Sequence, residues 1–187
     1  MQTTVIGLCG SLRVGSFNAA ALRLAGALLP EGLTMHSLDW RPVPVFDADV
    51  LAAGEPPLVS EFKRRIREAS GVVIATPEYN FSIPGGLKNL LDWLSRGSDQ
   101  PFVDKPVAVL SAATGPLGGA RVQYDLRRVM LFLNAAVLAK PEVFIGAAAS
   151  KFDAQGHCVD DTTRQFVRDQ MEAFGRWIKR MQRLQSL

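Results

Sequence analysis

Residues 3–9 read TTVIGLC and residues 10–18 read GSLRVGSFN, and these two adjoining segments decide the fold. The first is a continuous apolar and β-branched run, which is typical of a strand buried on both faces of a parallel sheet. The second contains two glycines, two serines, an arginine and an asparagine, and a helical pattern of alanine and leucine begins at Phe17. Together they predict a strand that enters a helix through a polar loop.

The rest of the chain alternates strand-like and helix-like segments. Strands are expected at residues 34–38, 71–75 and 106–112, and over 135–144 with an interruption at Lys140-Pro141. Helices are expected at residues 17–29, 57–69, 85–95, 119–133 and 161–185, with an irregular Pro-rich segment at 39–50 and turns at 151–160. This alternation predicts an α/β fold, a three-layer doubly wound parallel sheet of about five strands in the flavodoxin-like order 2-1-3-4-5. We expect residues 1–187 to form this single domain.

The composition excludes several classes of protein. Hydrophobic residues make up 48% and charged residues 21% of the chain, which excludes disordered and collagen-like proteins. No apolar run approaches the roughly 20 residues that span a bilayer, and no signal-peptide pattern is found, so we expect a cytoplasmic protein without membrane partners. The net charge of +3 is too small to indicate nucleic-acid binding. Six basic residues are expected to form a solvated helix face: Arg164, Arg168, Arg176, Lys179, Arg180 and Arg183.

Four residues of types that often bind metals or carry redox chemistry stand alone in the sequence, namely Cys9, Cys158, His36 and His157. Their spacing matches neither a zinc site nor a redox motif. We therefore expect two buried, unpaired thiols in a reducing compartment and no metal site.

The loop at residues 10–18 has the composition of a phosphate site. A phosphate monoester requires clustered donors, and a helix N-terminus presents free N–H groups with a partial positive charge. The two glycines allow the backbone N–H groups to point inward, and side-chain donors are expected from Ser11, Arg13, Ser16 and Asn18. Neither a P-loop nor a G-x-G-x-x-G motif is present, so the loop suits one terminal phosphate. The alternative is an ordinary turn in which Ser16 or Asn18 caps the helix.

Two further loops are expected at the same edge of the sheet, where doubly wound folds bind ligands. Residues 76–93, TPEYNFSIPGGLKNLLDW, offer aromatic faces at Tyr79 and Phe81 and polar groups at Glu78 and Asn80. Residues 111–121, SAATGPLGGAR, contain three glycines that allow the backbone to approach a ligand closely. Each loop alone is compatible with a surface loop or a helix entry, but three of them at one edge indicate a ligand site.

These segments resemble the NADPH-dependent FMN reductase family, and most closely its branch of bacterial chromate and quinone reductases. The resemblance rests on GSLRVGSFN, TPEYNFSIPGGLKNLLDW and GPLGGAR, and it extends over nearly the whole chain. It implies a flavodoxin-like fold, bound FMN, and ping-pong two-electron reduction of quinones, chromate or similar acceptors by NADH or NADPH, with the flavin carrying the redox chemistry. It also implies homodimers or homotetramers.

The resemblance assigns roles by position. The residues implied to hold the FMN phosphate are Ser11, Arg13, Ser16, Phe17 and Asn18. The residues implied to line the isoalloxazine ring are Pro77, Glu78, Tyr79, Asn80, Ala113, Thr114 and Gly115. A hydrogen-bonded network near a subunit interface is implied for Arg121, Tyr124 and Glu142. We also expect Tyr79 and Asn80 to shape the acceptor pocket and Arg121 to attract the anionic nicotinamide cofactor or anionic acceptors.

Two other functions are compatible with the same sequence. One is a flavodoxin-like electron carrier, although the mildly basic net charge is unlike the acidic surfaces that such carriers often have. The other is a flavin-free interaction domain on the same fold, since a fold alone does not determine a function.

Overall fold

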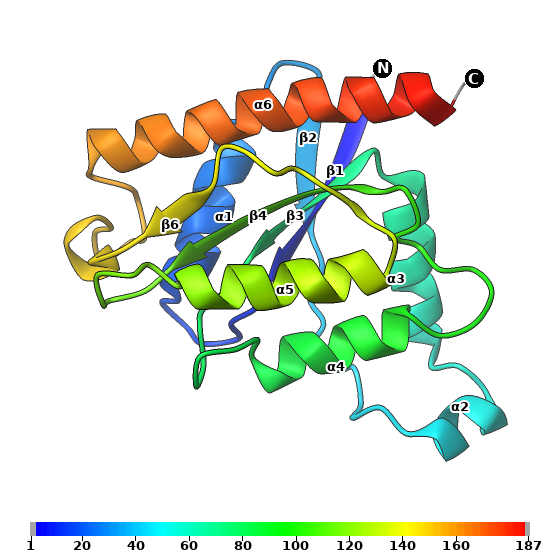
Figure 1. Cartoon of the computed structure of the whole chain (residues 1–187). Helices are drawn as coiled ribbons and strands as arrows, with labels where there is room; N and C mark the ends of the chain where they lie inside the picture. Colours follow the sequence, from blue (N-terminus) through cyan, green and yellow to red (C-terminus); the bar gives the residue numbers. More distant parts are fainter. Residues whose placement is uncertain (1–2, 186–187) are drawn as a thin grey trace.

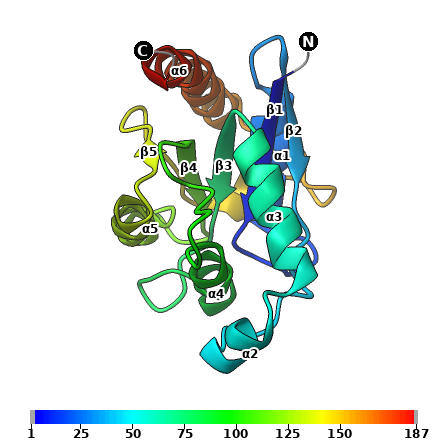
Figure 2. The same ribbon diagram turned by 90° about the vertical axis from the view of Figure 1, so that its right-hand side faces the viewer.

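The computed structural model describes residues 3–185, and it contains a parallel sheet between two layers of helices (Figures 1 and 2). The elements follow the order β1(Thr3–Cys9), α1(Phe17–Ala27), β2(Leu33–Ser37), α2(Ala48–Ala53), α3(Pro57–Glu68), β3(Gly71–Ala75), α4(Gly85–Leu94), β4(Pro106–Ala112), α5(Ala120–Phe132), β5(Ala136–Val137), β6(Val143–Ile145), a 3-10 turn at Ala148–Ser150, and α6(Asp161–Gln185). All the strand pairs in the sheet are parallel, and the order β2-β1-β3-β4-β5 confirms the predicted flavodoxin-like topology.

Successive residues of each strand point to opposite faces of the sheet, and a hydrophobic core lies on each face. Val5, Val73 and Ala108 belong to the core under α1 and α6, whereas Ile6 and Val72 belong to the core under α3, α4 and α5. Strands covered on both faces in this way have continuous apolar sequences, which is why β1, β3 and β4 could be recognised from their composition. In Figure 1, α6 crosses above the sheet, and α4 and α5 lie below it.

The predicted interruption at Lys140-Pro141 is confirmed, but the prediction that residues 135–144 belong to one strand is wrong. Two short strands stand there instead: β5 pairs with the beginning of β4, and β6 pairs with its end. Pro141 has no N–H to donate, so it cannot continue a ladder of sheet hydrogen bonds. In the gap, the Gln170 side-chain amide of α6 donates to Val109 O and Pro141 O, both at 3.0 Å, and partly replaces the missing ladder.

The prediction of an irregular segment over residues 39–50 is wrong at its end, where α2 begins. Asp47 caps this helix, because its carboxylate accepts a hydrogen bond from Asp49 N at 2.8 Å. None of the six residues of α2 is buried, so the helix has no apolar periodicity that a sequence pattern could reveal.

Two smaller expectations have mixed outcomes. Cys9 and Cys158 are both unpaired, but Cys9 is only half-buried, so the expectation of two buried thiols holds for Cys158 alone. The expected solvated face of α6 is confirmed, because five of its six basic residues are exposed and Arg164 is half-buried.

Among the helices of residues 3–185, none combines the length and the apolar character that a membrane span requires.

Candidate functional site

Three loops meet at the edge of the sheet where β1, β3 and β4 end, and the strand arrows in Figure 1 point to this edge. Gly10 N donates to Ala75 O at 2.8 Å, and Thr76 N donates to Leu110 O at 3.1 Å, so neighbouring loops are joined at their first residue. A Cβ at Gly10 would lie 2.3 Å from Thr76 Oγ1, which shows how closely the first loop passes the second. The structure therefore brings together the three loops that the sequence singled out.

The first loop presents free backbone donors at the start of α1. Ser16 is the N-cap, and its hydroxyl oxygen accepts from Ala19 N at 3.3 Å. No hydrogen bond within residues 3–185 uses the backbone N–H groups of Val14, Gly15, Phe17 or Asn18. Unpaired N–H groups at a helix N-terminus form an anion site, so the loop fits a phosphate group.

The polar side chains of this loop contribute unequally. The Asn18 amide is buried and faces β4, where it donates to Ala112 O and accepts from Ala112 N, both at 2.9 Å. The expected side-chain donor at Asn18 is thus used inside the protein, which leaves its backbone N–H for a ligand. Arg13 is exposed, and its guanidinium lies 5.9 Å from the centre of the Phe17 ring. The Ser11 hydroxyl oxygen accepts from Arg13 N at 3.4 Å.

The second loop forms a tight hairpin after Pro77. Tyr79 and Ser82 exchange backbone hydrogen bonds of 3.1 and 3.0 Å, and the two residues between them, Asn80 and Phe81, have φ angles of 50° and 69°. Two successive residues at positive φ are the feature of a type I′ turn. The hairpin exposes half of the Tyr79 side chain and most of the Phe81 side chain at the edge of the site.

Glu78 has a structural role that the sequence did not reveal. Its carboxylate accepts from Arg121 N at 3.1 Å and from Val122 N at 3.3 Å, so it caps α5, whose own N-cap residue, Gly119, has no side chain. The same carboxylate is bound by the Arg121 guanidinium, with Nε at 2.7 Å. Glu78 therefore joins the second loop to α5.

The third loop is held against the residues that follow β6. Ala113 N donates to Ile145 O at 3.0 Å, and a Cβ at Gly146 would lie 2.4 Å from Pro116 O. Within residues 3–185, the N–H groups of Thr114 and Gly115 have no hydrogen-bond partner. These two groups are available to the polar edge of a flat ligand.

The implied network of Arg121, Tyr124 and Glu142 is only partly brought together. Glu142 forms an ion pair with Lys140, and the hydrogen bonds from Lys140 and Tyr124 lower the pKa of the Glu142 carboxyl against the opposing effect of burial. Arg121 binds Glu78 instead, and its guanidinium carbon lies 3.8 Å from the centre of the Phe81 ring. In this chain Tyr124 and Glu142 form one cluster and Arg121 belongs to another.

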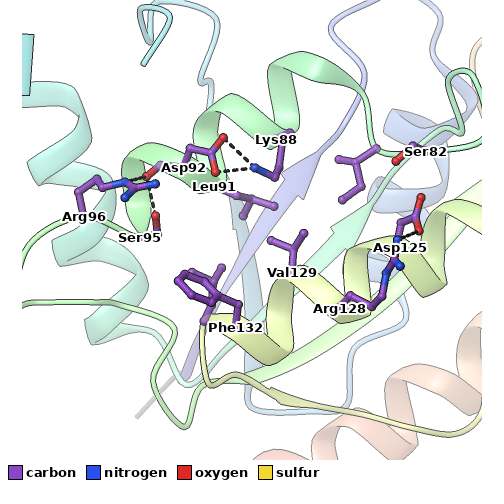
Figure 3. Close-up of a pocket in the computed structure, with 12 residues that line it drawn as sticks. Ser82, Lys88, Leu91, Asp92, Ser95, Arg96, Asp125, Arg128, Val129 and Phe132 are labelled. Carbon is purple, nitrogen blue, oxygen red and sulfur yellow. Dashed lines mark hydrogen bonds and ion pairs between the residues drawn. The ribbon is translucent and has the colours of Figure 1, made fainter. Parts of the chain in front are cut away.

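A groove between α4 and α5 is a feature that the sequence analysis did not identify (Figure 3). It encloses about 470 Å³, with Ile83 and Leu91 on one side and Val129 and Phe132 on the other. Each helix adds an ion pair to the rim, Lys88 with Asp92 at 2.6 Å and Arg128 with Asp125 at 2.5 Å. Phe132 remains 79% exposed, so the groove has an apolar floor and an apolar margin.

Comparison with known proteins gives the chain its family. The family model of the NADPH-dependent FMN reductases matches residues 3–150, which include all three loops. The chain belongs to this family.

Three similar proteins match this chain over almost its whole length. An NAD(P)H-dependent FMN reductase from Pseudomonas aeruginosa is 46% identical over 177 residues, which cover 95% of this chain and 96% of that protein. A quinone reductase from Escherichia coli is 44% identical over 180 residues, with coverage of 95% and 96%. The solved structure of FerB, a flavoenzyme NAD(P)H:(acceptor) oxidoreductase from Paracoccus denitrificans, superposes with a TM-score of 0.88 at 33% identity, and the match covers 96% of this chain and 98% of FerB.

Proposed function

We propose that this protein is an FMN-dependent oxidoreductase that transfers two electrons from NADH or NADPH to quinones. The observation that carries the proposal is the set of unpaired N–H groups where β1 passes into α1, at the edge where two further loops supply aromatic faces and free backbone donors. Family membership and the quinone reductase relative support the same conclusion. Chromate, as an oxyanion, is a further acceptor in this proposal.

The proposal divides the site between the phosphate and the ring of FMN. For the phosphate it assigns the N–H groups of the first loop together with the side chains of Ser11, Arg13 and Ser16. For the ring it assigns Pro77, Glu78, Tyr79 and Asn80 on one side and Ala113, Thr114 and Gly115 on the other. Bound FMN supplies the two-electron chemistry, and the protein binds and orients it. The N–H groups of Thr114 and Gly115 are suited to stabilise negative charge at the ring edge.

The function is tested by removing and restoring FMN. We expect the purified protein to bind FMN stoichiometrically and to oxidise NADH or NADPH with quinone and chromate acceptors, and we expect the stripped protein to lose this activity until FMN is added. Rapid mixing with NADPH under anaerobic conditions should bleach the flavin absorption directly. Flavin that is not bleached would indicate an electron carrier, and a protein that takes up no FMN would refute the proposal.

We further propose that two copies of the chain associate through the groove between α4 and α5, as a homodimer or as part of a homotetramer. Further apolar side chains are exposed on α5 and just before it, because Tyr124 and Leu131 of α5 are 54% and 78% exposed and Leu117 of the preceding loop is 56% exposed. Clusters of exposed apolar side chains are typical of protein interfaces. The two unpaired cysteines fit a reducing compartment, and we propose the cytoplasm.

The double substitution Leu131→Glu and Phe132→Glu is expected to convert the oligomer to a monomer, because it places two charges in an apolar contact. Multi-angle light scattering after gel filtration measures the change. Phe166→Glu is the control, since Phe166 is 58% exposed on α6, which packs on the other face of the sheet from α4 and α5. A double variant with an unchanged mass would exclude this face as the interface.

A further inference from the structure

The ion pair between Glu78 and Arg121 connects the two loops proposed to frame the flavin ring. Glu78 belongs to the loop that follows β3, and Arg121 lies in the first turn of α5, directly after the loop that follows β4. The Glu78 side chain is only 9% exposed, and its two oxygens accept hydrogen bonds from two backbone N–H groups and from the guanidinium. A nearly buried carboxylate with this many donors holds both loops in one arrangement.

The same pair supports the turn at the tip of the hairpin. Phe81 has a φ angle of 69°, which is uncommon for a bulky residue and persists only where its surroundings hold it. The Arg121 guanidinium covers the Phe81 ring at 3.8 Å while it binds Glu78. Glu78, Arg121 and Phe81 thus form a stack that fixes the hairpin carrying Tyr79 and Asn80.

The charges of the pair cancel at this edge of the sheet. The carboxylate is shielded from water, and the guanidinium is 47% exposed, so removal of either partner leaves a unit charge of known sign beside the loops. A reduced flavin carries more negative charge than an oxidised one. A nearby unpaired cation therefore favours the reduced form, and an unpaired carboxylate disfavours it.

We propose that Glu78 and Arg121 are a pair of positioning residues that fix the ring-facing hairpin and keep the net charge beside the ring at zero, so that the reduction potential of the bound cofactor depends on both. This inference rests on the proposed function, because it requires FMN at the site. It assigns the two residues a role through the backbone and the local charge rather than a part in proton or electron transfer.

The experiment compares Glu78→Gln with Arg121→Gln by anaerobic dye equilibration and by titration of the stripped protein with oxidised FMN. We expect Glu78→Gln to raise the midpoint potential and Arg121→Gln to lower it, so that the ratio of the affinities for reduced and oxidised FMN changes roughly tenfold in opposite directions. The double variant should return towards the wild-type potential. Arg64→Gln is the control, because it breaks half-exposed ion pairs within α3, which belongs to neither loop, and its potential should not change.

A purely structural role for the pair would weaken FMN binding in both variants and leave the potentials unchanged or shifted in the same direction, and either result overturns the inference. Wild-type protein that binds no FMN would instead refute the proposed function itself. The two failures are therefore distinguishable in one set of measurements.

Discussion

The Lys63→Met variant is expected to unfold with a free energy about 3 kcal/mol lower than the wild type. The Lys63 side chain is 2% exposed, although it carries a full charge. Its ammonium group binds the Glu55 carboxylate, donates to Arg96 O at 2.7 Å and lies 3.4 Å from Asp99 Oδ1. Methionine keeps the apolar stem but leaves two carboxylates and a carbonyl without their shared cation. Urea unfolding followed by circular dichroism measures the loss.

Lys88→Met serves as the control for this prediction. Lys88 forms an ion pair with Asp92 at 2.6 Å, but its side chain is 44% exposed, and pairs of this kind contribute only about 0.2–1 kcal/mol. Equal losses in the two variants would show that the burial of Lys63 has no energetic importance.

The stability difference between wild type and Lys63→Met should also depend on pH. Burial alone would raise the pKa of Asp99, but the hydrogen bond from Arg67 and the charge of Lys63 lower it overall. A carboxyl whose pKa is lowered on folding adds stability above its unfolded pKa, and that stability is lost as the pH falls through the folded value. The advantage of the wild type should therefore be largest near neutral pH and should diminish in acid. A difference that grows on acidification would contradict this explanation.

The sequence predicted the elements whose burial produces a regular pattern. The predicted start of α6 at Asp161 was confirmed, and the helix continues to Gln185, the last residue that the structure describes, because apolar residues at helical spacing face the sheet and basic residues face water. The apolar runs of β1, β3 and β4 placed three loops at one edge, and the structure confirms this arrangement. Apolar residues at helical spacing indicate a helix with one buried face, and an unbroken apolar run indicates a strand that is buried on both faces.

Contacts between residues that are far apart in the chain produce no hydrophobic pattern in the sequence, so they were not predicted. Glu78 caps a helix that begins more than forty residues later, and nothing in the sequence near Gly119 indicates that the capping side chain comes from another loop. The resemblance grouped Arg121 with Tyr124 and Glu142 near a subunit interface, and within one chain Arg121 pairs with Glu78. The polar loop around Asn18 predicted that its side chain would donate to a ligand. In the structure, the Asn18 side-chain amide is hydrogen-bonded to the backbone of Ala112. Side-chain types suggested the candidate site, and only tertiary contacts show which of these side chains remain available to a ligand.

The second large effect is expected at Gly10, where alanine should weaken FMN binding and lower the stability by about 1–3 kcal/mol. The new Cβ would lie 2.3 Å from Thr76 Oγ1 and 2.8 Å from Thr76 Cβ. Thr76 is completely buried, so it cannot move aside, and the first loop must shift away from the second. This displacement separates the proposed phosphate donors from the proposed ring-facing hairpin. Fluorescence titration with FMN and thermal unfolding of the stripped protein measure the two losses separately.

Gly26→Ala is the matched control for Gly10→Ala, since it introduces the same methyl group in the last turn of α1. Its Cβ would meet Met35 at 3.4 Å, an ordinary van der Waals contact, and alanine favours a helix interior by up to about 1 kcal/mol over glycine. We therefore expect Gly26→Ala to be as stable as the wild type or more so and to bind FMN normally. If Gly10→Ala bound FMN as tightly as Gly26→Ala, the close approach of the first two loops would not be needed for the site, because the cofactor would then tolerate their separation.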